Sequence, residues 1–120
     1  MGDILKEKSY AFASRIVKLS RYLNEEKKEF VLSKQVLRSG TSIGANVEEA
    51  KQGQSRTDFV HKLSISNKEA FETNYWLRLL RDSELIGDKM ADSLLNDCEE
   101  LQKLLVASIK TVRKNSDRQG

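Results

Sequence analysis

Four stretches of this chain carry apolar residues at alternating intervals of three and four, and no proline interrupts any of them. Such spacing places the apolar side chains of each stretch on one face of an α-helix. With no proline and only six glycines in 120 residues, little besides short polar breaks can stop a helix. The sequence therefore predicts an all-α protein with a single core.

The four stretches predict helices with approximate bounds 3–24, 33–53, 57–82 and 88–113. Asp3 is expected to cap the first helix, and either Ser55 or Thr57 the third, because their side-chain oxygens accept hydrogen bonds from free N–H groups. Gly53 is expected to end the second helix.

Short connections between these helices favour antiparallel neighbours, so we predict an up-down-up-down four-helix bundle. An average apolar spacing of 3.5 residues favours left-handed supercoiling of that bundle. Residues after Lys114 show no apolar periodicity. We therefore expect residues 1–115 to form the bundle domain and residues 116–120 to form a frayed tail.

The second predicted helix carries two neighbouring seams of different chemistry. The apolar seam comprises Val36, Gly40, Ile43, Val47 and Ala50. The polar seam comprises Gln35, Ser39, Ser42, Asn46, Glu49 and Gly53. Small residues allow another backbone to approach closely, and polar side chains need partners wherever that approach excludes water. We therefore expect this helix to make contacts on two sides.

Charged residues accompany the polar seam. Arg38 lies on the second helix, and Glu69 and Glu72 on the third, so charge-assisted hydrogen bonds can form across a helix pair or between subunits. The alternative is that these charges are simply solvated. The small, neutral neighbours of Arg38 favour the bonded arrangement. The expected oligomer interface comprises Arg38, Ser39, Ser42, Asn46, Glu49, Glu69 and Glu72.

The chain is mildly basic, with a formal net charge of +3 and a pI near 9.0. This excess can reflect solvated helix faces and a loose tail, or it can favour RNA, DNA or an anionic surface. The candidate nucleic-acid contacts are Lys62, Lys68, Arg78, Arg81, Lys110, Arg113 and Lys114. No base-reading motif accompanies them, so phosphate contacts would supply the binding.

Catalytic and metal-binding motifs are missing from the pattern. Paired metals in a helical bundle use Glu-x-x-His motifs, whereas the one histidine, His61, follows Asp58 at that spacing. Gly40 and Gly44 lack the lysine and strand context of a phosphate loop. Serines inside helices usually bond to their own backbone. We expect no enzyme activity, no metal, no cofactor and no small-molecule substrate.

Cys98 lies among apolar positions of the fourth predicted helix, so we expect a buried, inert thiol in a reducing compartment. The N-terminal residues alternate in charge, which is unlike a signal peptide. No apolar run reaches the ~20 residues that a membrane span requires. These features predict a cytoplasmic protein without a membrane partner.

Two segments resemble one bacterial family. RSGTSIGANVEEA (38–50) and DFVHKLSISNKEAFETNYWLRLL (58–80) resemble the second and third helices of the four-helix-bundle proteins encoded in 23S rRNA intervening sequences, the S23 family. The resemblance implies a homopentameric ring with no associated catalytic activity. It also implies a relationship to accessory proteins of diversity-generating retroelements, which are thought to bind nucleic acid and a reverse transcriptase. The chain departs from the family pattern at Gly44, where many relatives have proline, and at Ala50, where glycine is common.

Two functional hypotheses follow. The first is a non-enzymatic bundle that assembles with copies of itself, most simply as the pentamer that the resemblance implies. The alternative is an accessory protein that binds structured RNA or DNA, with assembly multiplying a weak basic surface on each subunit. The two hypotheses are compatible with each other.

Overall fold

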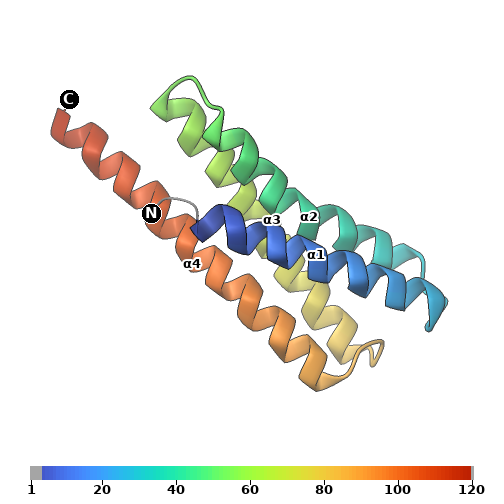
Figure 1. Cartoon of the computed structure of the whole chain (residues 1–120). Coiled ribbons are helices and arrows are strands. Elements are labelled where there is room, and N and C mark those ends of the chain that lie inside the picture. The colour runs from blue at the N-terminus through green and yellow to red at the C-terminus, as the bar shows by residue number, and fades with distance from the viewer. Residues whose placement is uncertain (1–3, 120) are drawn as a thin grey trace.

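The computed structural model describes the backbone of residues 4–119 and the side chains of residues 4–115 (Figure 1). The described residues contain no strand. The structure consists of four helices, α1 (Ile4–Glu25), α2 (Val31–Lys51), α3 (Arg56–Asp82) and α4 (Asp88–Gln119). The predicted all-α, four-helix fold is therefore confirmed.

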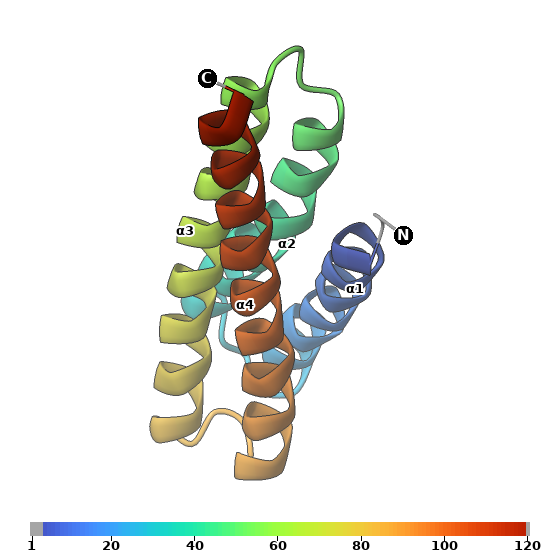
Figure 2. The same ribbon diagram turned by 90° about the vertical axis from the view of Figure 1, so that its left-hand side faces the viewer.

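Consecutive helices run in opposite directions around one core. Helix α2 packs between α1 and α3, and α3 packs against α4, while α4 meets α1 less closely. Figure 2 shows α3 and α4 side by side along much of the molecule. The bundle is a rod of 53 × 22 × 22 Å. The left-handed supercoil stays a prediction.

The apolar patterns form the core that the sequence predicts. Each helix contributes residues with essentially no exposed surface, and burial of each large apolar side chain contributes about 1.5–3 kcal/mol. The largest of these buried side chains are Phe12, Ile16, Leu23, Val36, Ile43, Val47, Leu63, Leu77, Leu80, Leu94, Leu101 and Leu105. The apolar seam of α2 is therefore an interior surface.

Cys98 is fully buried, as predicted. Its thiol donates a hydrogen bond to the Ala70 carbonyl oxygen over 3.3 Å, so it links α4 to α3. Burial raises the pKa of this thiol to about 12, with smaller contributions from Glu99 and Asp97. The thiolate, which is the reactive form, is therefore suppressed at neutral pH.

The helix ends differ in detail from the prediction. Ser55 caps α3 by accepting a hydrogen bond from the Asp58 backbone N–H over 3.1 Å, which decides between the two candidate caps. Helix α2 ends at Lys51, before the expected Gly53, and no glycine adopts a positive φ within the described residues. Asp3 lies outside the described residues.

Helix α4 continues to Gln119, beyond its expected end near Arg113. Residues 116–119, for which the sequence predicts a frayed tail, extend the helix, because no glycine or proline in this segment stops it. Gly120 lies outside the described residues. The apolar periodicity of α4 therefore indicates which of its residues pack against the core. It does not indicate where the helix ends.

The contact between α1 and α2 depends on glycine. A Cβ atom at Gly40 would lie 2.8 Å from two side-chain carbons of the fully buried Ile16. A Cβ atom at Gly44 would lie 3.3 Å from the Ser9 carbonyl oxygen. The two helices are thus close enough that α2 has little room for side chains on this face.

We predict that Gly40→Ala destabilises the protein. The new methyl group must displace Ile16, which outweighs the better helix propensity of alanine and leaves a net loss of about 1 kcal/mol or more. Urea unfolding followed by circular dichroism measures the change. Gly87→Ala is the control, because a methyl group there would have no other atom within 4 Å, and its effect should stay within about 0.5 kcal/mol. Equal stability of the two variants would contradict the prediction.

Candidate functional site

A network of charged and aromatic side chains joins α2 to α3 on the outside of the bundle. The Arg38 guanidinium donates hydrogen bonds to both Glu69 oxygens, over 2.9 and 3.2 Å, and another to Glu72. The Trp76 indole N–H also donates to Glu72, over 2.9 Å. The predicted bonding of Arg38 to the two glutamates thus occurs within one chain.

The bonds change the acidity of the groups that they join. The hydrogen bond from Arg38 lowers the pKa of Glu72 most strongly, and the bond from Trp76 lowers it further. In turn, the bonds to Glu72 and Glu69 raise the pKa of Arg38. The exposed side-chain fractions are 48% for Arg38, 18% for Glu69 and 35% for Glu72, so solvent screens the network in part. Arg38 and Glu72 therefore stay charged at neutral pH, and their interaction is only moderately strong.

Beneath this network lies a buried line of hydroxyl groups. The Ser39 and Thr73 hydroxyl oxygens are 2.9 Å apart, and the Ser66 hydroxyl donates to the Ile43 carbonyl oxygen over 2.8 Å. All three residues have no exposed surface. The Ser39 side chain is thus enclosed between α2 and α3 of its own chain, and its part in an oligomer interface stays a prediction.

Ser42 and Asn46 lie beside the network and are half-buried. Ser42 donates to the Arg38 carbonyl oxygen over 2.6 Å, and Asn46 donates to the Ser42 carbonyl oxygen over 2.8 Å. Between them, Ala45 is exposed. Both polar side chains thus bond to the backbone of their own helix.

The rest of the predicted interface is also paired within the chain. Glu49 accepts a hydrogen bond from Lys62 over 2.7 Å, which joins α2 to α3 farther along the same pair of helices. We call the surface formed by Arg38, Ser42, Ala45, Asn46, Glu49, Glu69, Glu72 and Trp76 the α2–α3 face. Lys62, a candidate nucleic-acid contact, therefore lies at the edge of this face.

Two other candidate nucleic-acid contacts, Arg78 and Arg81, lie three residues apart on α3. Arg81 pairs with Asp82 over 3.0 Å and with Asp92 over 3.7 Å. The Arg78 guanidinium donates to Asn74 over 2.8 Å and lies 5.9 Å from the centre of the Tyr75 ring. Acidic partners therefore offset Arg81. Arg78, by contrast, bonds to a neutral amide.

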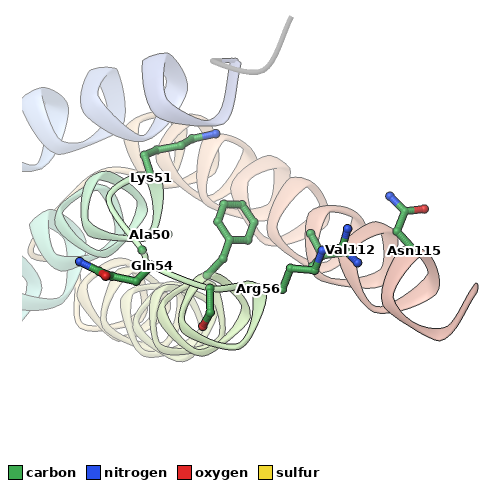
Figure 3. A pocket seen from close by; sticks show the side chains of 9 residues that line it. Ala50, Lys51, Gln54, Arg56, Val112 and Asn115 are labelled. Carbon is green, nitrogen blue, oxygen red and sulfur yellow. The ribbon is translucent and has the colours of Figure 1, made fainter. Parts of the chain in front are cut away.

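The cations of α4 have a different setting. Lys110, Arg113 and Lys114 are exposed on α4, whose Val112 and Asn115 line a pocket of about 430 Å³ at the end of the bundle where α2 leads into α3. Figure 3 shows Lys51 and Arg56 among the residues that line this pocket. Sequence reasoning missed both residues, since they flank a turn and follow no helical period. The feature of the sequence that could have identified them is their position on either side of the turn around Gly53.

Two further observations concern metal binding and membrane insertion. No three histidine, cysteine, aspartate or glutamate side chains gather as a metal-binding group within the described residues, and His61 is exposed. Over the same part of the chain, no helix combines the length and apolar character needed to cross a bilayer.

The comparisons with known proteins assign this arrangement to a family. The family model described as "23S rRNA-intervening sequence protein" matches residues 4–107, which span all of α1, α2 and α3 and much of α4. The chain belongs to the 23S rRNA-intervening sequence protein family. The resemblance seen in α2 and α3 is thereby confirmed. No curated protein matches this family member's sequence.

A solved structure shares the fold closely. It is the crystal structure, at 1.70 Å resolution, of a protein with unknown function from the S23 ribosomal protein family of Bacteroides thetaiotaomicron VPI-5482. The two chains are 56% identical and superpose with a TM-score of 0.89. The match covers 90% of this family member and 96% of the Bacteroides chain.

The Arg38 network predicts a pH-dependent contribution to stability. Because the folded state lowers the pKa of Glu72, the stabilisation is complete above its ordinary value of 4.5 and is lost as the pH falls through the lowered pKa. Glu72→Gln should lower the free energy of unfolding at pH 7 by about 1 kcal/mol or less, given the solvent exposure. It should also flatten the loss of stability between neutral and acidic pH.

Urea unfolding over a pH series measures both effects. Glu25→Gln provides the control, because Glu25 is an exposed glutamate in α1. If Glu72→Gln and the unmodified protein lose stability equally on acidification, the network does not hold Glu72 as the structure indicates.

Proposed function

We propose that this family member is a non-enzymatic protein that assembles with copies of itself through the α2–α3 face. The observation that carries the proposal is that the polar groups of this face are already bonded within one chain. Ser42 and Asn46 bond to their own helix, and Arg38 bonds to two glutamates. A second copy can therefore cover the face without leaving these groups unpaired, which avoids the main penalty of burying polar atoms.

The shape and composition of the face support the same proposal. Ala45 is exposed on the α2 side, where it also lines a pocket with residues of α1, and Ile65 and Trp76 are half-buried on the α3 side. They lie among Arg38, Glu49, Glu69 and Glu72, whose charges are all paired within the chain. Partly buried tryptophan is also common at the centre of protein interfaces.

A closed ring suits this surface. A ring requires the α2–α3 face of one copy to meet a different surface of the next copy, and the family resemblance implies five subunits. Within that ring, Arg38, Ser42, Asn46, Glu49, Glu69 and Glu72 lie at or beside the contact, and Ser39 supports it from inside the bundle. We place the assembly in the cytoplasm, where the buried Cys98 thiol remains reduced.

Light scattering during size exclusion tests the assembly. We expect a particle several times heavier than the 13.7 kDa chain, and five times heavier for the pentamer. Ser42→Glu should shift the particle toward the monomer, because it places an unpaired carboxylate in the contact.

The matched control is Ser93→Glu, which makes the same change at an exposed position of α4. It should leave the mass unchanged. A clean monomer for the unmodified protein at micromolar concentration would refute self-assembly. An unchanged mass for Ser42→Glu would show that the α2–α3 face is not the contact.

A second candidate function, binding of RNA or DNA, is favoured by one observation. Lys110, Arg113 and Lys114 lie within five residues of one another on α4, and all three are exposed. Such a grouping attracts phosphate without reading base sequence. In a ring with cyclic symmetry, every copy presents this group in the same way, which multiplies a weak contact.

Fluorescence anisotropy with a labelled RNA hairpin and a labelled DNA duplex tests this second function. We expect binding at low ionic strength that weakens steeply as salt is added, because each phosphate contact releases condensed counterions. Absence of binding to both probes at low salt would remove nucleic acid as a partner.

A further inference from the structure

A groove lies between α1 and α2, on the side of the bundle next to the α2–α3 face. Its volume is about 360 Å³. Most of its lining residues are small, and they come from the first half of α1 and the second half of α2: Ser9, Tyr10, Ala13, Thr41, Gly44, Ala45 and Glu48. We call it the α1–α2 groove. Because Ala45 also belongs to the α2–α3 face, the two surfaces are continuous.

The hydroxyl groups of the α1–α2 groove are already bonded within the chain. Ser9 donates to the Lys6 carbonyl oxygen over 3.1 Å, and Thr41 donates to the Leu37 carbonyl oxygen over 2.7 Å. At the rim, Tyr10 is 74% exposed. Covering the groove would therefore leave neither hydroxyl unpaired and would remove a large aromatic side chain from water, so the groove is suited to a protein contact.

The outer edge of α3 carries side chains that complement this groove. Phe71 is 60% exposed, and Lys68, three residues earlier on the same side of the helix, is also exposed. They directly precede Glu72 and Glu69, so they lie about 100° around α3 from the Arg38 network. Lys68 has no ion pair within the described residues. An apolar side chain and an unpaired cation therefore border the α2–α3 face.

The groove and the α3 edge lie at the same level along the rod. Ser39 and Thr73 face each other, with their hydroxyl oxygens 2.9 Å apart, and α2 and α3 are antiparallel. Thr41, two residues after Ser39, is therefore level with Phe71, two residues before Thr73. In a ring whose axis runs along the rods, cyclic symmetry keeps every copy at one level. Phe71 of one copy is then level with the groove of the next copy.

The charges match by the same count. Lys68 is level with Gly44, one helical turn from Glu48. Side chains of a helix lean toward its N-terminus, which brings Lys68 and Glu48 of antiparallel helices toward each other. The Glu48 side chain is 49% exposed, and its contact with Lys6 is 3.7 Å long. Glu48 is thus open to a second cation.

The angle between the two surfaces favours a ring. Helix α2 packs between α1 and α3, so the α1–α2 groove and the α2–α3 face lie on adjacent sides of the bundle. Adjacent sides of a four-helix bundle meet at about a right angle. Copies joined through them turn at each step and close into a small ring, whereas copies joined through opposite sides continue in a row.

We infer that the α1–α2 groove of one copy receives the outer edge of α3 from the next copy. Phe71 lies in the groove, and Lys68 pairs with Glu48 on its rim. The aromatic side chain supplies most of the affinity, and the charge pair fixes the alignment. This inference rests on the proposed self-assembly and names the second surface that a ring requires.

Two exposed phenylalanines provide a matched test. Phe71→Ala removes the side chain that occupies the groove, and Phe30→Ala removes one of nearly equal exposure, 59%, just before α2. Light scattering over a dilution series measures the concentration at which half of the protein is assembled, after circular dichroism has established that both variants fold. We expect Phe71→Ala to raise this concentration at least about tenfold. Phe30→Ala should leave it unchanged.

A charge exchange tests the pairing across the contact. Glu48→Lys and Lys68→Glu should each weaken assembly, because each places like charges together. The double variant restores opposite charges and should assemble within about threefold of the unmodified protein. Since the double variant still lacks the contact between Glu48 and Lys6 of its own chain, recovery reports on the contact between copies.

The possible failures are distinguishable. If the unmodified protein is a monomer, this inference and the proposed self-assembly fail together. If Ser42→Glu dissociates the particle while Phe71→Ala behaves like Phe30→Ala, the α2–α3 face is a contact, but the groove is left to another occupant and its assignment is wrong. If the double charge variant assembles no better than the single variants, Lys68 does not meet Glu48 and the assignment is also wrong.

Discussion

The close packing of α2 against both of its neighbours is the constraint on which the rest of this bundle depends. On one side, Gly40 packs against the Ile16 side chain and Gly44 against the Ser9 backbone of α1, with little room for a larger residue. On the other side, the Ser39, Ser66 and Thr73 hydroxyls bond between α2 and α3 inside the bundle. Interior hydroxyls must be paired, so a shift of α2 by one turn would leave them unsatisfied. These contacts fix α2 in both distance and register.

The external network follows from that register. Arg38 reaches Glu69 and Glu72 because Ser39, the next residue, is held opposite Thr73. Glu49 reaches Lys62 farther along the same pair of helices. The buried apolar side chains supply most of the free energy of folding, while the hydroxyls and ion pairs select one alignment of two helices that could otherwise slide.

The sequence was sufficient for the fold and for part of the candidate site. Strict three-four spacing identified all four helices, and the two seams of α2 identified its two packed sides. The role of Ser39 could not be read from the seam alone, since one stripe can contain an enclosed residue beside exposed ones. Its depth depends on where α3 lies. Lys51 and Arg56 were missed for a related reason, because the pocket exists only when the turn between α2 and α3 meets α4.

The inward bonding of Ser42 and Asn46 also has a kinetic consequence. Side chains that are fixed before association lose little conformational entropy when they are covered. A surface prepared in this way needs no rearrangement between encounter and final contact, so its association rate is set by orientation and long-range charge. The α2–α3 face is therefore suited to rigid docking, in which subunits join in the shape that each already has as a separate chain.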